Sequence, residues 1–346
     1  MYNPFVGILK FILSLLVVAI HVQPFEGAVG FYLNNCIARL AVPIFFILSS
    51  YYLFDKLQKN NWDKTIFAKH QIHLTKYYFV WVLLNLPFIL NLLLNSTNSL
   101  SEFIWKLIQG ILLKGPYGAL WFLPASLLGL ALCFYLGKRT NYKVCCVLSL
   151  PLFLFATIQI EYNAFVKDIA WINTVNGFFT SIFGWLANGL NVGFFFCAIG
   201  FYIAANKQKT RKISQDILKA ILSIGLLLVE TTLIRKYQLG VDYWAMFFII
   251  PSAYYISQVV LNMKPTKNEK TILIAKQLQT LSLLIYPMHF AIMDMLKILF
   301  ADINIYQKST TLQFFVVITI TLGLSAILLY LGEKKNIRCI KTLYGK

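Results

Sequence analysis

The sequence predicts an all-α protein that crosses a membrane about ten times. Of its 346 residues, 59% are hydrophobic and only 13% are charged. A soluble domain is instead roughly 45–50% apolar and about 25% charged. The apolar residues also fall in blocks of about 18–22, the length at which a helix crosses a hydrocarbon core of roughly 30 Å. These features exclude a soluble globular enzyme, a disordered chain and a small disulfide scaffold.

Ten apolar blocks are the predicted spans. They cover residues 5–23, 37–54, 77–94, 119–136, 143–159, 189–205, 216–234, 243–262, 278–299 and 311–332. An even number of spans places both termini on one side of the membrane. No soluble domain interrupts the blocks, so we expect one membrane domain over residues 1–335 and a basic cytoplasmic tail over 336–346.

The basic residues predict the orientation of the spans. The formal charge is +18, from 31 Lys and Arg against 13 Asp and Glu. With both termini in the cytoplasm, 21 of the basic residues lie in the inner loops and the tail, and six lie in the outer loops. Inner loops of membrane proteins carry such an excess. The charge therefore indicates topology and attraction to anionic membrane lipids, and we expect no nucleic-acid partner.

Ionisable side chains within the spans are costly, and each is a functional hypothesis by default. The informative ones are Lys10, His21, Arg39, Glu230, His289, Asp294 and Lys297. Lys10 and His21 are eleven positions apart on one predicted helix, so they share a face and lie roughly 16 Å apart. The direction of each span places His21 in the outer half of the bundle together with Arg39, Glu230 and Asp294.

A histidine that faces an outer polar cavity is suited to general-base catalysis on a hydroxyl, because its unperturbed pKa lies near neutrality. Arg39, with Asn191 at the outer end of its span, would stabilise the negative charge that develops on oxygen. Glu230 or Asp294 would orient the imidazole, and the sequence leaves the choice between them open.

The same residues also have structural interpretations, which stay open at this point. In the structural interpretation, Lys10 extends its ammonium group to the inner membrane interface. His21 ends its span at the outer membrane interface. Arg39 and Glu230 then form a buried ion pair, and His289 is a packed core histidine.

Other residues would hold the two substrates. Lys10, His73 and Lys76 lie toward the inner face, where they would bind a phosphate-bearing donor. Trp121, in the segment LWFLP, is either a substrate contact or an interfacial anchor. His289 is the further candidate for substrate binding. The chain has no zinc-ligand spacing, phosphate-binding loop or nucleophile elbow, so we expect no metal.

Five segments follow one another in a recognisable order. KFILSLLVVAIH contains a basic residue, Lys10, and a histidine, His21, with ten residues between them. IARLAVPIFFILSSYYLF begins its span with Arg39. LWFLPASL (120–127), NVGFFFCAIGFYI (191–203) and IYPMH (285–289) come later. Together they resemble integral-membrane acyltransferase family three, which includes many bacterial O-acetyltransferases.

The resemblance implies ten spans in a multi-pass protein of the bacterial plasma membrane. His21 matches the essential histidine of that family, Lys10 its basic partner and Arg39 the arginine of span two. The donor would be a cytoplasmic acyl-CoA, normally acetyl-CoA. The acceptor would be a hydroxyl of an envelope glycan or polyol on the far side.

The chain departs from the family pattern at several positions. Gly7 stands where members often have an acidic residue, and Ser50 where they have glycine. Ala119 and Leu190 replace a histidine and an arginine found in similar relatives. Two other functions compete with acyl transfer. An outer polar cavity among ten spans also suits a transporter or flippase of a small or lipid-linked envelope precursor, and structural charges suit a catalytically degenerate membrane scaffold or sensor.

Overall fold

The protein is all-helical throughout the part that the structure describes. The computed structural model describes residues 2–207 and 212–345, and every regular element in these ranges is a helix. Seven helices are long and apolar enough to cross a membrane, and a bent pair makes an eighth. The fold class predicted from composition is confirmed. Part of the predicted inner loop 206–215, residues 208–211, lies outside the described residues, as do residues 1 and 346.

A helical segment corresponds to each of the ten predicted spans. In chain order they are α1 (Pro4–Val22), the composite helix Gly27–Lys59, the pair α4 (Lys64–Leu84) and α5 (Leu86–Ser96), η4 with α7 (Gly118–Arg139), α8 (Tyr142–Ile160), η6 with α10 (Gly189–Ala205), α11 (Ile213–Tyr237), α12 (Ile249–Asn262), α13 (Glu269–Leu299) and α15 (Thr310–Glu333). Shorter helices lie between these segments or follow the last of them. In chain order they are α6 (Leu100–Gln109), η3 (Gly110–Lys114), η5 (Asn163–Phe165), α9 (Ala170–Phe183), α14 (Asn304–Lys308), α16 (Arg338–Lys341) and η7 (Thr342–Tyr344).

Helix lengths depart from uniform spans. The composite helix has 33 residues and α13 has 31, whereas α12 has only 14. The predicted span 77–94 is a broken helix, because α4 and α5 meet at an angle of 66°. Asn85 separates them and Pro87 opens α5, where its missing N–H group needs no helical partner.

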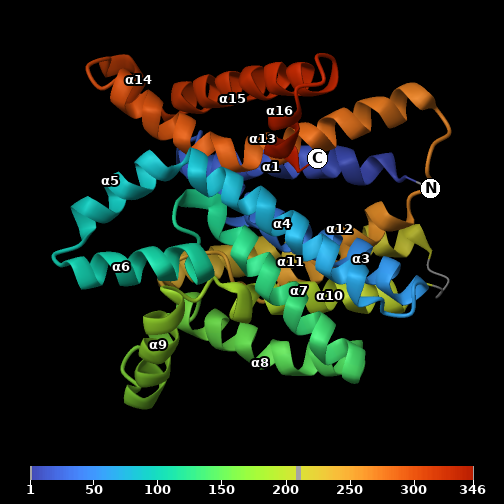
Figure 1. The fold of residues 1–346 in the computed structure, drawn as a ribbon. Coiled ribbons are helices and arrows are strands. Elements are labelled where there is room, and N and C mark those ends of the chain that lie inside the picture. The colour runs from blue at the N-terminus through green and yellow to red at the C-terminus, as the bar shows by residue number, and fades with distance from the viewer. Residues whose placement is uncertain (1, 208–211, 346) are drawn as a thin grey trace. The chain divides into compact units, whose positions relative to one another are not determined.

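The chain forms two compact units, Met1–Val42 with Gln258–Lys346, and Pro43–Ser257. We call these the terminal unit and the central unit. In the terminal unit α1 packs along α13, and α13 packs against α15 (Figure 1). Apolar side chains such as Val18, Ile285 and Val317 form the core between these three helices. This packing brings the first predicted span beside the ninth.

In the central unit, α7, α8 and α10 pack together (Figure 1). The short helix η6 packs against all three. Aromatic rings fill the core, with Phe67 stacked on Phe134 at a centroid distance of 3.9 Å. Ser50 donates a hydrogen bond to the backbone carbonyl of Cys197 on α10. Ser50, which stands where the family has glycine, therefore links the composite helix to α10 by a hydrogen bond.

The basic C-terminal segment is folded onto the end of α15. Tyr344 is buried, and its hydroxyl donates to Oε1 of Glu333 over 3.1 Å. Burial and this hydrogen bond raise the pKa of Tyr344 to about 12. The phenol therefore keeps its proton and remains a donor at neutral pH.

Candidate active site

The first helix carries Lys10 and His21. The Asn3 side chain accepts a hydrogen bond from the N–H of Phe5, and Pro4 occupies the first turn, which is a typical start for an α-helix. The helix then runs without interruption to Val22, so His21 lies in its last turn. The prediction that Lys10 and His21 belong to one helix is confirmed.

Arg39 lies at an irregular junction of the second helical segment. A π-helix, η1 (Leu33–Ile37), is followed by a 3₁₀ turn, η2 (Ala38–Leu40), and both pack against α1. The helical segment begins at Gly27, ten residues before the predicted span. Arg39 is therefore inside a continuous helical path and not at its start. π-helical turns of this kind occur frequently at functional sites.

His289 lies beside His21. Its ring centroid is 5.4 Å from that of His21, and the side chain is fully buried. Nδ1 is 3.1 Å from the carbonyl oxygen of Ile285, whereas Nε2 is buried with no hydrogen-bond partner among the described residues. Phe290 meets the His21 ring edge-on at 5.0 Å. A buried polar atom without a partner is expensive, which makes Nε2 a candidate contact for a bound molecule.

Charged side chains complete this cluster in the terminal unit. Arg39 and Lys297 are the cations that act electrostatically on the His21 ring. Lys297 is also 3.7 Å from the Asp294 carboxylate, one turn away on α13. The structure thus pairs the rings of His21 and His289, packs the turn that carries Arg39 (η2) against the helix that carries His21, and gives Asp294 a cationic neighbour. That Asp294 orients His21 stays a prediction.

Two other predicted site residues belong to the central unit. Glu230 accepts hydrogen bonds from the backbone N–H groups of Phe247 and Phe248 and from the Tyr162 hydroxyl, at 2.7–2.8 Å. Asn191 donates from Nδ2 to the carbonyl of Leu152 over 3.0 Å. These contacts hold loops and helix ends in place. Catalytic roles for Glu230 and Asn191 stay predictions.

The remaining predicted binding residues are also in the central unit. His73 and Lys76 are exposed on α4, together with Lys69 one turn earlier, and spacings of three and four residues put them on one helix face. This basic face suits a phosphate-bearing molecule. Trp121 lies at the end of η4 (Gly118–Trp121), with its ring edge-to-face against Trp185.

Sequence reasoning missed two features of the site. It named His289 but not its pairing with His21, and it did not single out Trp185. The only signal for Trp185 was the aromatic richness of the segment 160–188. Within the described ranges, no group of three or more His, Cys, Asp or Glu side chains is arranged to hold a metal ion.

A family model described as an acyltransferase domain matches residues 3–330. The chain belongs to this family. Nearly all of the described helices fall within the matched acyltransferase domain, and the apolar helices make it a multi-pass membrane protein. The resemblance seen in the short motifs is thereby confirmed over almost the whole chain.

Curated relatives of this acyltransferase-family chain are longer proteins. It is 25% identical over 344 residues to an amino-acid racemase of Enterococcus faecalis, covering 96% of the chain and 47% of that relative. It is also 25% identical over 350 residues to a serine/alanine racemase of Enterococcus gallinarum, covering 97% and 47% respectively. The chain thus spans about half the length of these relatives. No solved structure matches it.

Proposed function

We propose that this chain is a membrane O-acyltransferase that moves an acetyl group from cytoplasmic acetyl-CoA to a hydroxyl of an envelope or exported glycan on the outer side. The observation that carries the proposal is the cluster of His21, His289 and Arg39 in a chain of the acyltransferase family. The proposal includes both termini in the cytoplasm and a location in the bacterial plasma membrane.

His21 is the proposed general base. It lies in the last turn of α1, half-buried beside the rings of His289 and Phe290. Its ring takes the proton from the acceptor hydroxyl as that oxygen attacks the acyl carbonyl carbon. The same proton then passes to the sulfur that leaves, so the base is regenerated. Arg39 supplies positive charge near the carbonyl oxygen.

Basic residues are proposed to hold the donor. Acetyl-CoA supplies the acetyl group as a thioester and carries several phosphates. Lys10 on α1 and the exposed face formed by His73 and Lys76 on α4 would bind those phosphates. Trp121 and Asn191 would contact the acceptor.

The names of the relatives suggest a second acceptor to assay. One of them is called a serine/alanine racemase, and serine carries a hydroxyl that can be acylated. Free serine therefore joins the envelope glycans as a candidate acceptor. The transporter alternative predicts movement of substrate without any new ester bond.

The test measures ester-linked acetyl groups on envelope glycans of the host. Cells that lack the gene are compared with cells complemented by the wild-type chain or by His21→Ala. We expect wild type to restore acetylation and His21→Ala to lower the rate by about 10²–10⁴-fold, the range for loss of a general base. Restoration by His21→Ala to the wild-type level would refute the mechanism.

A binding measurement separates catalysis from folding. Coenzyme A at about 100 times its Kd should stabilise the purified chain by roughly 2.7 kcal/mol. His21→Ala should retain this stabilisation, because His21 is assigned to the acceptor hydroxyl and not to the phosphates. Lys76→Gln should reduce it. Absence of any stabilisation of the wild-type chain by coenzyme A would favour the transporter or scaffold alternative.

A further inference from the structure

A cavity of about 420 Å³ lies in the central unit, and its lining includes none of the residues assigned to proton transfer. Its walls include the aromatic rings of Tyr117, Trp121 and Trp185 and the polar side chains of Lys106, Gln109 and Lys114. Ligand pockets in proteins are typically about 300–1,000 Å³, mostly apolar with a few placed polar groups. This cavity has that size and that lining.

The aromatic walls are held in a fixed arrangement. The rings of Trp121 and Trp185 are 5.4 Å apart at an interplanar angle of 83°. Nε2 of Gln109 donates to the carbonyls of Ser181 and Ile182 at 2.9 and 3.1 Å, which fastens the end of α9, and so the segment bearing Trp185, to α6. The rings are therefore placed before any ligand arrives.

A tight backbone turn closes the same wall. Gly115 has a φ of +79°, and a Cβ atom at this position would collide with the backbone of Trp121. The position therefore requires glycine. Because of this turn, the side chains of Lys114 and Trp121 line the same cavity.

Trp185 presents an unused hydrogen-bond donor. Its Nε1 atom is buried and has no hydrogen-bond partner among the described residues. Buried indole N–H groups normally find a partner. A ligand oxygen in the cavity would supply one.

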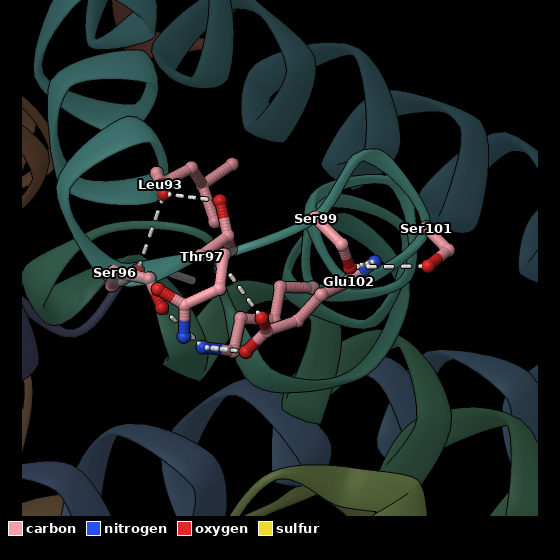
Figure 2. A network of polar contacts seen from close by, with 8 residues as sticks. Leu93, Ser96, Thr97, Ser99, Ser101 and Glu102 are labelled. Atoms are coloured by element: carbon pink, nitrogen blue, oxygen red, sulfur yellow. Dashed lines mark hydrogen bonds and ion pairs between the residues drawn. The ribbon is translucent and has the colours of Figure 1, made fainter.

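The two lysines of the cavity are not equivalent. Lys106 is 2.8 Å from the Glu102 carboxylate and donates to the carbonyl of Ser96 over 2.7 Å. Figure 2 shows the surrounding network, in which Thr97 donates to the carbonyl of Leu93. The charge of Lys106 is thus neutralised by Glu102, although the side chain still lines the cavity.

Lys114 carries the uncompensated charge. It is exposed and has no ion-pair partner among the residues that the structure describes. By contrast, the N–H of Asn98 and the ammonium of Lys106 hold the pKa of Glu102 below its usual range, so that pair stays charged and occupied at neutral pH. Lys114 therefore gives the cavity a net positive charge.

We propose that this cavity binds an acidic sugar residue of the acceptor glycan. The apolar C–H face of the ring packs against Trp121 and Trp185. The Trp185 Nε1–H donates to a ring substituent oxygen, and Lys114 pairs with a carboxylate or phosphate on the sugar. This assignment rests on the proposed function, because it specifies the acceptor class of that reaction.

The test uses two probes that share one ring and differ in charge. Methyl β-D-glucuronide and methyl β-D-glucoside are titrated into the purified 346-residue chain in detergent, and binding is followed by calorimetry. We expect the glucuronide to bind about two- to tenfold more tightly, as for one partly exposed ion pair. Lys114→Gln should abolish the difference without affecting folding, because that side chain is exposed.

Matched variants test the tryptophan. Trp185→Phe keeps an aromatic ring but removes the N–H group, and should weaken both probes about two- to tenfold, as for one hydrogen bond. Trp171→Phe is the control, because Trp171 is 68% exposed on α9. Lys308→Gln on α14 is the control for charge.

The outcomes separate this proposal from the acyltransferase proposal. Equal binding of both probes, or glucuronide binding unchanged in Lys114→Gln, would overturn the acidic-sugar site. So would failure of both probes to bind while vesicles of phosphatidylglycerol bind in a Lys114-dependent way, which would assign the cavity to a lipid headgroup. Lys114-dependent glucuronide binding would support the site even if no acetyl transfer is detected.

Discussion

At the scale of single residues, Gly7 sets the distance between two helices. A Cβ atom at Gly7 would lie 2.5 Å from the carbonyl oxygen of Ala275 on α13, closer than real Cβ contacts allow. The absence of a side chain lets α1 and α13 approach at this level. Gly7 replaces an acidic residue common in similar proteins, and the structure gives this departure a packing role.

The departure at Ser50 has a comparable explanation. Its hydroxyl donates to the carbonyl of Cys197, and its Cβ atom lies close to Gly200 on α10. The pair of small residues allows α3 (Ala41–Lys59) and α10 to pack closely. Ser50 is therefore accounted for without reference to catalysis.

The packing role of Gly7 leads to a matched pair of substitutions. Gly7→Ala should lower the free energy of unfolding by about 1–3 kcal/mol, the range for overpacking. Gly225→Ala on α11 should leave it unchanged or raise it by up to about 1 kcal/mol, because a Cβ atom there meets nothing within 4 Å. Denaturant unfolding in detergent measures both. Equal effects of the two substitutions would contradict the close contact.

At the scale of elements, Glu230 connects three of them. It lies near the end of α11, and it accepts from backbone N–H groups at Phe247 and Phe248 just before α12 and from Tyr162 after α8. The nearby Glu161 also accepts from a backbone N–H, that of Ala245, at 2.7 Å. Two buried carboxylates thus hold the segment that leads into α12.

Glu230→Gln distinguishes a structural from a catalytic role. A glutamine keeps one acceptor and turns an NH₂ group toward backbone donors, so the free energy of unfolding should fall by about 1.5–3 kcal/mol, the range for a hydrogen bond to a charged group. Tyr162→Phe should lower it by about 1 kcal/mol. Thermal unfolding and acetyl transfer are measured on the same samples. Unchanged unfolding with lost transfer would instead assign Glu230 to catalysis.

At the scale of the whole molecule, the basic residues predict that both termini face the cytoplasm. Cys339 is suited to test this, because it is the exposed cysteine among the six in the chain. An impermeant maleimide should label it only after the cells are permeabilised. Ser101→Cys, in a background with Cys339→Ser, should be labelled in intact cells, because Ser101 lies in the predicted outer loop. Labelling of Cys339 in intact cells would reverse the proposed orientation.

The candidate site was predictable in part. The spacing of Lys10 and His21 places them on one helix because the α-helical period is a local property of the chain, and α1 is continuous across both. Arg39 and His289 were identified because ionisable groups in apolar spans are rare. Their meeting with His21 depends on contacts between α1, η2 and α13, which are distant in the sequence. No periodicity encodes such contacts.

The sequence by itself determined the fold class, the number of apolar segments and the basic excess in the predicted inner loops. Each of these depends on whether a segment is more stable in lipid or in water, which its own hydropathy and charge decide. The tertiary structure decided the break at Asn85, the pairing of His21 with His289 and the cavity that Trp121 and Trp185 line. Each of these depends on which side chains fit together across separate helices. Packing is a property of pairs of surfaces, and it exists only once the helices are assembled.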